Sequence, residues 1–98
     1  MNIALDFDET ITLDAYFWGA FIELAKGQRH SVTIVTSRHP SPGTDYNEDI
    51  EEYAKAWRVD IVYAGSKQKR EVHKADVWID DAPESIPTYY QLHTDYPI

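Results

Sequence analysis

Short apolar runs alternate with amphipathic stretches along most of this chain. The first run, Asn2 to Phe7, is almost continuously apolar and predicts a buried parallel strand. Three further runs, rich in β-branched residues, predict strands at 31–36, 60–63 and 75–79. Helical patterns separate all four runs. This alternation predicts a three-layer, Rossmann-like α/β fold with a small, mostly parallel sheet and helices on both faces.

The stretches between the strands carry apolar residues at helical spacing. Asp14 is expected to cap the first helix, and Gly27 is expected to end it. Its apolar stripe is formed by Leu13, Phe17, Ala20, Phe21 and Leu24. Asp45 and Glu48 resemble a capping box for a second helix. The stripe of that helix is formed by Ile50, Tyr53, Ala54 and Trp57. A third, short helix is expected from Ser66 to about His73.

The composition indicates one small globular domain spanning residues 1–98. Hydrophobic residues make up 43% of the chain and aromatic residues 13%, which is enough for a modest core. No apolar run is long enough to span a membrane, and the N-terminus lacks the regions of a signal peptide. The chain has no cysteine, which excludes disulfides and thiolate zinc sites. We therefore expect a cytoplasmic protein with no membrane partner.

The charge is strongly acidic overall and locally basic. A net charge of -8 disfavours binding to extended nucleic acid, which requires a basic surface. Four cations nevertheless fall close together at Lys67, Lys69, Arg70 and Lys74. They form either a solvated helix face or a cationic rim that meets an anionic substrate.

Two pairs of aspartates follow predicted strands. Asp6 and Asp8 lie one residue apart after the first strand, and Asp80 and Asp81 follow the fourth. Because parallel strands end at the same edge of a sheet, these carboxylates are expected to meet. Two like charges about 4 Å apart repel by roughly 4 kcal/mol at an effective dielectric of 20. A divalent cation would relieve this repulsion, and oxygen ligands suit Mg²⁺.

Four motifs in this order resemble the haloacid dehalogenase superfamily of phosphohydrolases. They are Asp-Phe-Asp-Glu-Thr from Asp6, Thr-Ile-Val-Thr-Ser-Arg ending at Arg38, a lysine after the third strand, and Trp-Ile-Asp-Asp ending at Asp81. The resemblance extends from about Ile3 to Pro83. It implies a Mg²⁺-dependent phosphatase that works through an aspartyl-phosphate.

The resemblance also implies a role for each acidic residue. Asp6 would be the nucleophile, and Asp8 the general acid and base. The metal ligands would come from Asp6, the backbone carbonyl of Asp8, and the pair Asp80 and Asp81. Asp81 is preferred as the direct ligand, with Asp80 behind it or orienting the lysine.

The remaining candidate site residues lie on the first three motifs or directly after the second. Thr36 would hydrogen-bond a phosphoryl oxygen, and a lysine would neutralise charge during transfer. Lys69 is preferred for this role, with Lys67 next and Lys74 less well placed. Further contacts with the substrate would come from Thr10, Ser37, Arg38 and His39.

The intervals between the motifs leave room for about one helix each, so no cap domain is expected. An open site would suit a large substrate such as a phosphorylated nucleic-acid end or phosphoprotein, or would be closed by self-association. The aromatic residues available for such an interface are Tyr16, Phe17, Trp18, Tyr89 and Tyr90. One departure from the family pattern is Glu9, where many members have glycine.

Two other function classes remain open. A phosphoryl-accepting receiver domain also uses an acidic cluster, a threonine and a lysine on a parallel sheet. Receivers, however, carry the phosphorylated aspartate on a middle strand, whereas the third strand here ends in Tyr63-Ala64-Gly65. The other class is a catalytically idle relative that only binds a partner, which the full set of catalytic residue types disfavours.

Overall fold

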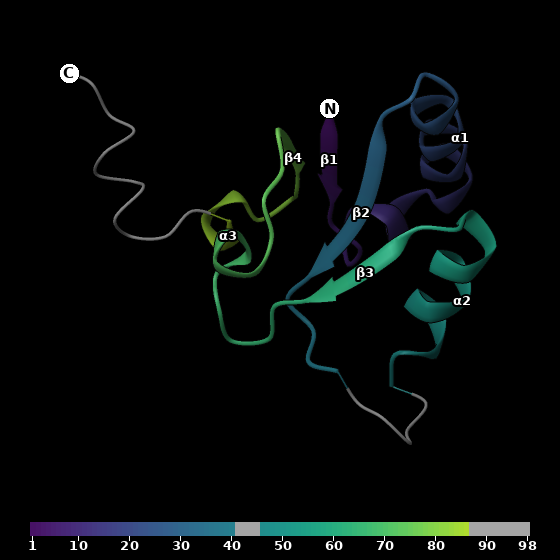
Figure 1. The fold of residues 1–98 in the computed structure, drawn as a ribbon. Coiled ribbons are helices and arrows are strands. Elements are labelled where there is room, and N and C mark those ends of the chain that lie inside the picture. Colours follow the sequence, from purple (N-terminus) through teal and green to yellow (C-terminus); the bar gives the residue numbers. More distant parts are fainter. Residues whose placement is uncertain (41–45, 87–98) are drawn as a thin grey trace.

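The computed structural model describes residues 1–40 and 46–86 of the chain (Figure 1). Strands and helices alternate, as the hydrophobic pattern predicted. The strands are β1 (Asn2–Leu5), β2 (Ser31–Thr36), β3 (Asp60–Tyr63) and β4 (Val77–Ile79). The helices are α1 (Ala15–Gly27), α2 (Glu48–Trp57) and α3 (Lys69–Val72), with 3₁₀ turns η1 (Ile11–Leu13) and η2 (Pro83–Ser85).

The four strands form one all-parallel sheet in the order β3-β2-β1-β4. From β1 the chain steps outward to β2 and β3, and then crosses back to β4 on the other side of β1. Right-handed crossovers in opposite directions place their helices on opposite faces of a sheet. Accordingly, α1 and α2 pack together on one face, while α3 lies on the other side (Figure 1). The predicted α/β architecture with a parallel sheet is confirmed.

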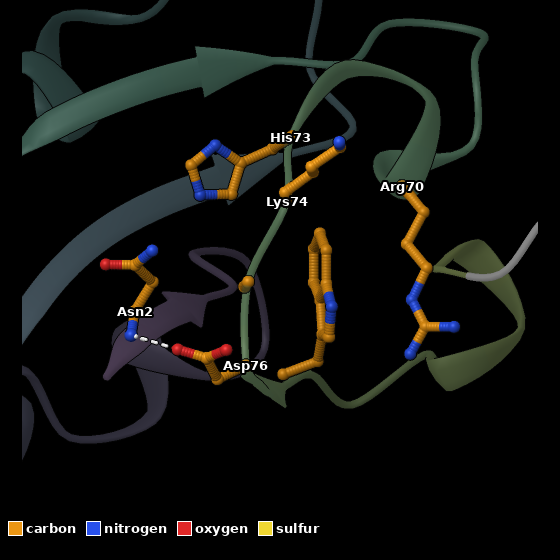
Figure 2. A pocket seen from close by; sticks show the side chains of 7 residues that line it. Asn2, Arg70, His73, Lys74 and Asp76 are labelled. Carbon is orange, nitrogen blue, oxygen red and sulfur yellow. Dashed lines mark hydrogen bonds between the residues drawn. The ribbon is translucent and has the colours of Figure 1, made fainter.

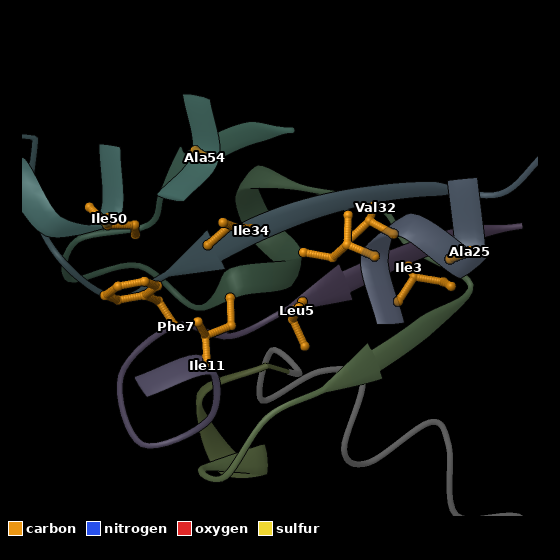
Figure 3. Packing of buried hydrophobic residues seen from close by; sticks show 10 residues of the cluster. Ile3, Leu5, Phe7, Ile11, Ala25, Val32, Ile34, Ile50 and Ala54 are labelled. Atoms are coloured by element: carbon orange, nitrogen blue, oxygen red, sulfur yellow. The ribbon is translucent and has the colours of Figure 1, made fainter. Parts of the chain in front are cut away.

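The hydrophobic core lies between the sheet and the pair α1 and α2. Alternate residues of β1 and β2 point into it, because successive strand side chains face opposite ways (Figure 3). Its buried members are Ile3, Leu5, Phe7, Ile11, Ile22, Ala25, Val32, Ile34, Ile50 and Ala54. The residues between them on β1, such as Ala4, and the following Asp6 therefore face the side of α3. This alternation places Asp6 opposite the core.

The predicted apolar stripe of the first helix is correct for Phe21, which packs against the core, and wrong for its other four members. Leu13, Phe17 and Leu24 are exposed to 72%, 57% and 65%, and Ala20 is exposed as well. Instead α1 buries Ile22 and Ala25 and packs the half-buried Trp18 and Phe21 against the core. Both sets have helical spacing, because α1 is apolar around most of its circumference. Periodicity alone does not distinguish the two sets of residues. The packing of α1 against β2 determines which set is buried.

Helix boundaries were predicted with mixed success. Asp14 accepts a hydrogen bond from the Phe17 amide at 3.0 Å, and α1 ends at Gly27, as expected. Ser66 does not cap α3; Gln68 does, and the helix is shorter than predicted. The residue before α2 is Asn47, while the predicted cap Asp45 lies outside the described residues.

Gly65 ends the turn after β3 with a backbone φ of +60°, which favours glycine. A Cβ atom at this position would lie 2.9 Å from the His39 ring, so a side chain here would also crowd His39.

Tyr89 and Tyr90, which the sequence suggested as interface candidates, lie outside the described residues. None of the described helices is long and apolar enough to cross a membrane.

Candidate active site

Three of the four acidic residues predicted to meet, Asp6, Asp80 and Asp81, are brought together at the carboxyl ends of β1 and β4. The two strands are neighbours, and the Asp6 amide donates to the Ile79 carbonyl at 2.9 Å, which extends their pairing past β1. The strands β2 and β4 flank β1 on opposite sides, so the direction of the strand order reverses beside β1. Such a reversal opens a crevice at the carboxyl edge, where ligands of parallel sheets bind.

A buried lysine joins the two acidic strand ends. The Lys69 side chain is 1% exposed, and its Nζ donates to Asp6 Oδ1 at 2.8 Å and to Asp80 Oδ2. Lys67 is exposed and lies outside the pocket, and Lys74 lines a different pocket. The structure therefore brings Lys69, the preferred lysine of the sequence analysis, into contact with the aspartates.

Local capping determines which lysine turns inward. Gln68 and Glu71 form a capping box in which the Gln68 amide donates to Glu71 Oε2 at 2.8 Å. Helix α3 therefore starts at Lys69, and the Arg70 amide is tied to the Ile86 carbonyl at 3.0 Å. With the helix start held in this way, the Lys69 side chain extends under the tip of β1. The sequence contains this capping box at Gln68 and Glu71, whereas the helix was expected to begin at Ser66.

Asp6 is buried to 7% exposure and is held at both oxygens. Thr10 Oγ1 donates to Asp6 Oδ2 at 3.0 Å, while Lys69 holds the other oxygen. Burial raises the pKa of Asp6 from 3.8 to about 6, although Lys69 acts in the opposite direction. Asp81 and Asp80 add to the increase. Asp6 is thus a carboxylate whose ionised form is costly in the absence of additional positive charge.

Three carboxylates are close enough to share a cation. Oxygen atoms of Asp6, Asp80 and Asp81 all lie within 4.8 Å of one another. Asp80 uses both oxygens within the protein, since Oδ1 accepts from the Ala82 amide at 2.9 Å and Oδ2 is held by Lys69. Asp81 is exposed. A pocket of about 210 Å³ opens over this group, lined by Asp6, Asp8, Glu9, Ser37, Lys69, Asp80, Asp81, Ala82 and Ser85.

Asp8 lines this pocket but its carboxylate is directed to Arg38. The two side chains form a fork: Nε donates to Oδ2 at 2.9 Å and one terminal nitrogen donates to Oδ1 at 2.7 Å. Asp8 is therefore not a member of the close carboxylate group. Its side chain is half exposed, at 49%. From the sequence, Asp8 was expected to join the other carboxylates, and Arg38 was not revealed as its partner.

Arg38 does not have the free donors that a substrate clamp would need. A second carboxylate, Asp49 of α2, receives hydrogen bonds from both terminal nitrogens, at 2.7 and 3.1 Å. The guanidinium also lies 5.1 Å from the ring centroid of Phe7. The predicted role of Arg38 as an anion clamp is therefore not supported in this arrangement. Asp49 was missed, because nothing in its local sequence pattern marks it.

The threonines and serine of the predicted site fall into different places. Thr36 is 1% exposed, and its Oγ1 accepts a hydrogen bond from the Arg38 amide at 3.2 Å. The neighbouring Ser37 is exposed and lines the pocket, whereas Thr36 does not. Thr10 is buried against Asp6.

Glu9 departs from the family pattern and has a distinctive backbone. Its φ is +62°, in the left-handed region that glycine adopts most easily. The strain is offset in part by a hydrogen bond from its amide to Thr12 Oγ1 at 2.9 Å. The exposed side chain lines the pocket, so it adds negative charge at the entrance.

Comparisons with protein-family models, with curated proteins and with solved structures find no match. Function is therefore inferred from the chemistry of the site.

Proposed function

We propose that this protein is a Mg²⁺-dependent phosphomonoester hydrolase of the haloacid dehalogenase type, with Asp6 as the nucleophile. The observation that carries the proposal is the buried contact of Lys69 with both Asp6 and Asp80 at the end of neighbouring strands. Burying an ammonium and two carboxylates is costly and is a poor way to gain stability. A buried carboxylate with a raised pKa, such as Asp6, beside a pocket is typical of catalytic sites.

The charge of the cluster fits a divalent cation. Asp6, Asp80 and Asp81 bring three negative charges, and Lys69 offsets one of them. Asp6 and Asp81 would hold Mg²⁺, since Asp81 is exposed and lines the pocket with Asp6. Asp80 would instead orient Lys69, to which it is already hydrogen-bonded. The backbone carbonyl of Asp8 would be a further ligand. When bound, Mg²⁺ would supply positive charge to the transferring phosphoryl group.

The residues of the chain would divide the reaction into two steps. An oxygen of Asp6 attacks phosphorus, and the ester P–O bond breaks as its electron pair passes to the leaving oxygen. Water then attacks the aspartyl-phosphate, which releases inorganic phosphate and restores the Asp6 carboxylate. Lys69 would remain beside both Asp6 and the phosphoryl oxygens and offset their charge. Thr10 and Lys69 would keep the nucleophile in one orientation.

Asp8 would move the protons. It would give one to the leaving oxygen and later take one from the attacking water. Both of its oxygens are engaged by Arg38, so this role requires the Asp8–Arg38 pair to open when substrate binds. Asp8 is half exposed and lines the pocket, which gives it room to turn.

The substrate would be a phosphate ester carried on a large molecule, or the site would be completed by self-association. The described residues contain no inserted domain between β1 and α1, where only η1 intervenes. The described part of the β2–α2 connection is likewise short. Catalytic efficiency on p-nitrophenyl phosphate should therefore be lower than on a 5′- or 3′-phosphorylated oligonucleotide or a phosphopeptide. If the protein sediments as a monomer and still prefers p-nitrophenyl phosphate, both the large-substrate proposal and the self-association proposal are contradicted.

The nucleophile assignment is tested with Asp6→Asn. The amide keeps the shape of the side chain but cannot attack phosphorus, so turnover with Mg²⁺ should fall by roughly 10³-fold or more. Asp60→Asn is the matched control, because Asp60 is exposed at the start of β3. It should retain full turnover. Substantial turnover by a folded Asp6→Asn protein would refute the assignment.

The engagement of Asp8 by Arg38 favours one second candidate, a phosphoryl-accepting domain. If Asp8 stays paired, nothing would activate water, and the aspartyl-phosphate would persist. The two candidates differ in the lifetime of the phosphorylated protein. Incubation with acetyl phosphate and Mg²⁺, followed by intact mass measurement, should show a long-lived adduct only for the phosphoryl acceptor. Continuous release of phosphate with no lasting adduct supports the hydrolase.

A further inference from the structure

A second pocket lies away from the carboxylate cluster, along α3 and the start of β4 (Figure 2). Its volume is about 430 Å³, which is in the range of small-molecule sites. It is lined by Asn2, Arg70, His73, Lys74, Ala75, Asp76 and Trp78. None of these residues lines the pocket at Asp6. The proposed hydrolase chemistry makes no use of it.

The lining is cationic in a protein of net charge -8. Arg70 and Lys74 supply two positive charges, and His73 lies beside Lys74 (Figure 2). Among the described residues, the acid in the lining is Asp76, whose Oδ2 accepts a hydrogen bond from the Asn2 amide at 2.7 Å. That carboxylate thus has a structural role at the start of β1. The local excess of positive charge would attract an anion.

Two polar ring atoms beside the pocket lack partners. His73 Nε2 and Trp78 Nε1 are shielded from water and make no hydrogen bond among the residues that the structure describes. A buried donor without a partner costs about 1–3 kcal/mol. The two rings contact each other edge to face, with centroids 6.2 Å apart. They therefore form an aromatic wall of the pocket with two polar atoms that lack partners among the described residues.

We propose that this pocket binds a small organic anion that joins a phosphate group to a flat aromatic ring, as in a nucleoside monophosphate. Lys74 would hold the phosphate, with Arg70 adding positive charge at the same pocket, and His73 and Trp78 would contact the ring and its polar atoms. Cations suit phosphate, and aromatic side chains suit the faces of bases. The site is independent of the proposed hydrolase activity, because it shares no residue with the carboxylate cluster.

The test uses the full chain, adenosine 5′-monophosphate as the probe, and EDTA to keep the carboxylate cluster free of metal and repulsive to anions. Binding should change tryptophan fluorescence and give a dissociation constant by calorimetry. Trp78→Phe should abolish the fluorescence change, whereas Trp57→Phe, a change in a different pocket, should preserve it. Lys74→Gln, at an exposed position, should weaken binding about tenfold.

Adenosine alone and inorganic phosphate alone should each bind more weakly than the monophosphate, since each offers half of the contacts. Asp6→Asn should leave binding unchanged, which separates this site from the proposed hydrolase. No binding at millimolar probe would overturn the proposal. Binding that Lys74→Gln and Trp78→Phe both leave intact would overturn it as well, because the ligand would then lie elsewhere. Circular dichroism of each variant establishes that it is folded.

Discussion

At the scale of single residues, the most informative contact is that of Lys69 with Asp6 and Asp80. It joins a helix start to two strand ends across 63 residues of sequence. Burial removes water from the Asp6 carboxylate, and the nearby charge of Lys69 does not fully compensate for this loss. The pKa of Asp6 therefore rises to about 6. The structure therefore places an energetic cost on the residue proposed as nucleophile. That cost predicts how stability depends on pH and on metal.

In the absence of metal, Asp6→Asn should stabilise the protein at neutral pH. The folded state binds the Asp6 proton more tightly than the unfolded state, whose pKa is near 3.8. The stability contributed by this group is thus fully present below pH 3.8 and is lost as the pH rises through 6. The shift corresponds to about 3 kcal/mol at most. Urea unfolding in EDTA should show the variant more stable at pH 7.5, with the difference shrinking below pH 5.

Arg38 links the strand end to α2, and its pairing with Asp49 can be measured. Hydrogen bonds to Asp8 and then Asp49 raise the pKa of Arg38, and Arg38 in turn lowers the pKa of Asp49. The contribution of Asp49 is present above pH 3.8 and is lost as the pH falls through its lowered pKa. Because Asp49 is half exposed, the coupling should be about 1 kcal/mol or less.

A double-mutant cycle with Arg38→Gln and Asp49→Asn measures this coupling. It should be unchanged between pH 7 and pH 5 and should decline by pH 3. Glu48→Gln, also in the first turn of α2, is the control and should show no coupling to Arg38→Gln. Zero coupling at pH 7 would mean that the contact adds no stability.

At the scale of elements, the short helix α3 determines the position of Lys69, the lysine proposed to take part in catalysis. Four residues alone do not form a stable helix in water, since helix nucleation is unfavourable. The capping box of Gln68 and Glu71 satisfies the first backbone donors, and the Arg70 amide is tied to Ile86. The same helix carries Lys69 to the carboxylates and Arg70 to the second pocket. Its first turn thus connects both proposed sites.

Glu71→Ala should therefore reduce both stability and turnover. Loss of the cap should cost about 1 kcal/mol. Turnover should fall by more than this loss of folded protein explains, because Lys69 would no longer be held against Asp6. Glu71→Gln is the control, since glutamine also serves in a capping box and should retain most activity. Equal turnover of the alanine and glutamine variants, measured well below the melting temperature, would contradict this role of the cap.

At the scale of the whole molecule, the reversal of strand order beside β1 assembles the site. The order β3-β2-β1-β4 makes the first and last strands neighbours, so acids 74 residues apart in the chain end side by side. The fold thereby collects negative charge at one edge. Mg²⁺ that binds this edge only in the folded state should stabilise the whole domain by mass action.

Mg²⁺ should accordingly raise the melting temperature. At 100 times its dissociation constant, a ligand adds about 2.7 kcal/mol, and 1 kcal/mol moves the transition of a domain this size by about 4–8 °C. Asp81→Ala should remove most of this gain, and Glu84→Ala, an exposed acid of η2, should retain it. KCl at equal ionic strength controls for screening. Absence of Mg²⁺ binding in calorimetry would contradict the proposed metal site.

The sequence by itself determined the order of elements and the candidate acidic residues. Strands Ser31–Thr36 and Asp60–Tyr63 were predicted with the observed bounds, and Asp14 caps α1 as expected. These features depend on local physics: β-branched runs favour strands, and cap side chains bind amides three residues away. The placement of Asp6 and Asp80 at one edge follows from parallel pairing and was predictable in the same way.

Only the tertiary structure decided which side chains touch. The local sequence did not distinguish which of three lysines, Lys67, Lys69 or Lys74, contacts the aspartates. The packing of α3 buries Lys69 and leaves Lys67 exposed. The Arg38 partner Asp49 belongs to another element, and the buried face of α1 was set by contact with β2. Each outcome depends on elements distant in the chain. Local periodicity restricts which residues can face inward, whereas packing geometry selects which of them do.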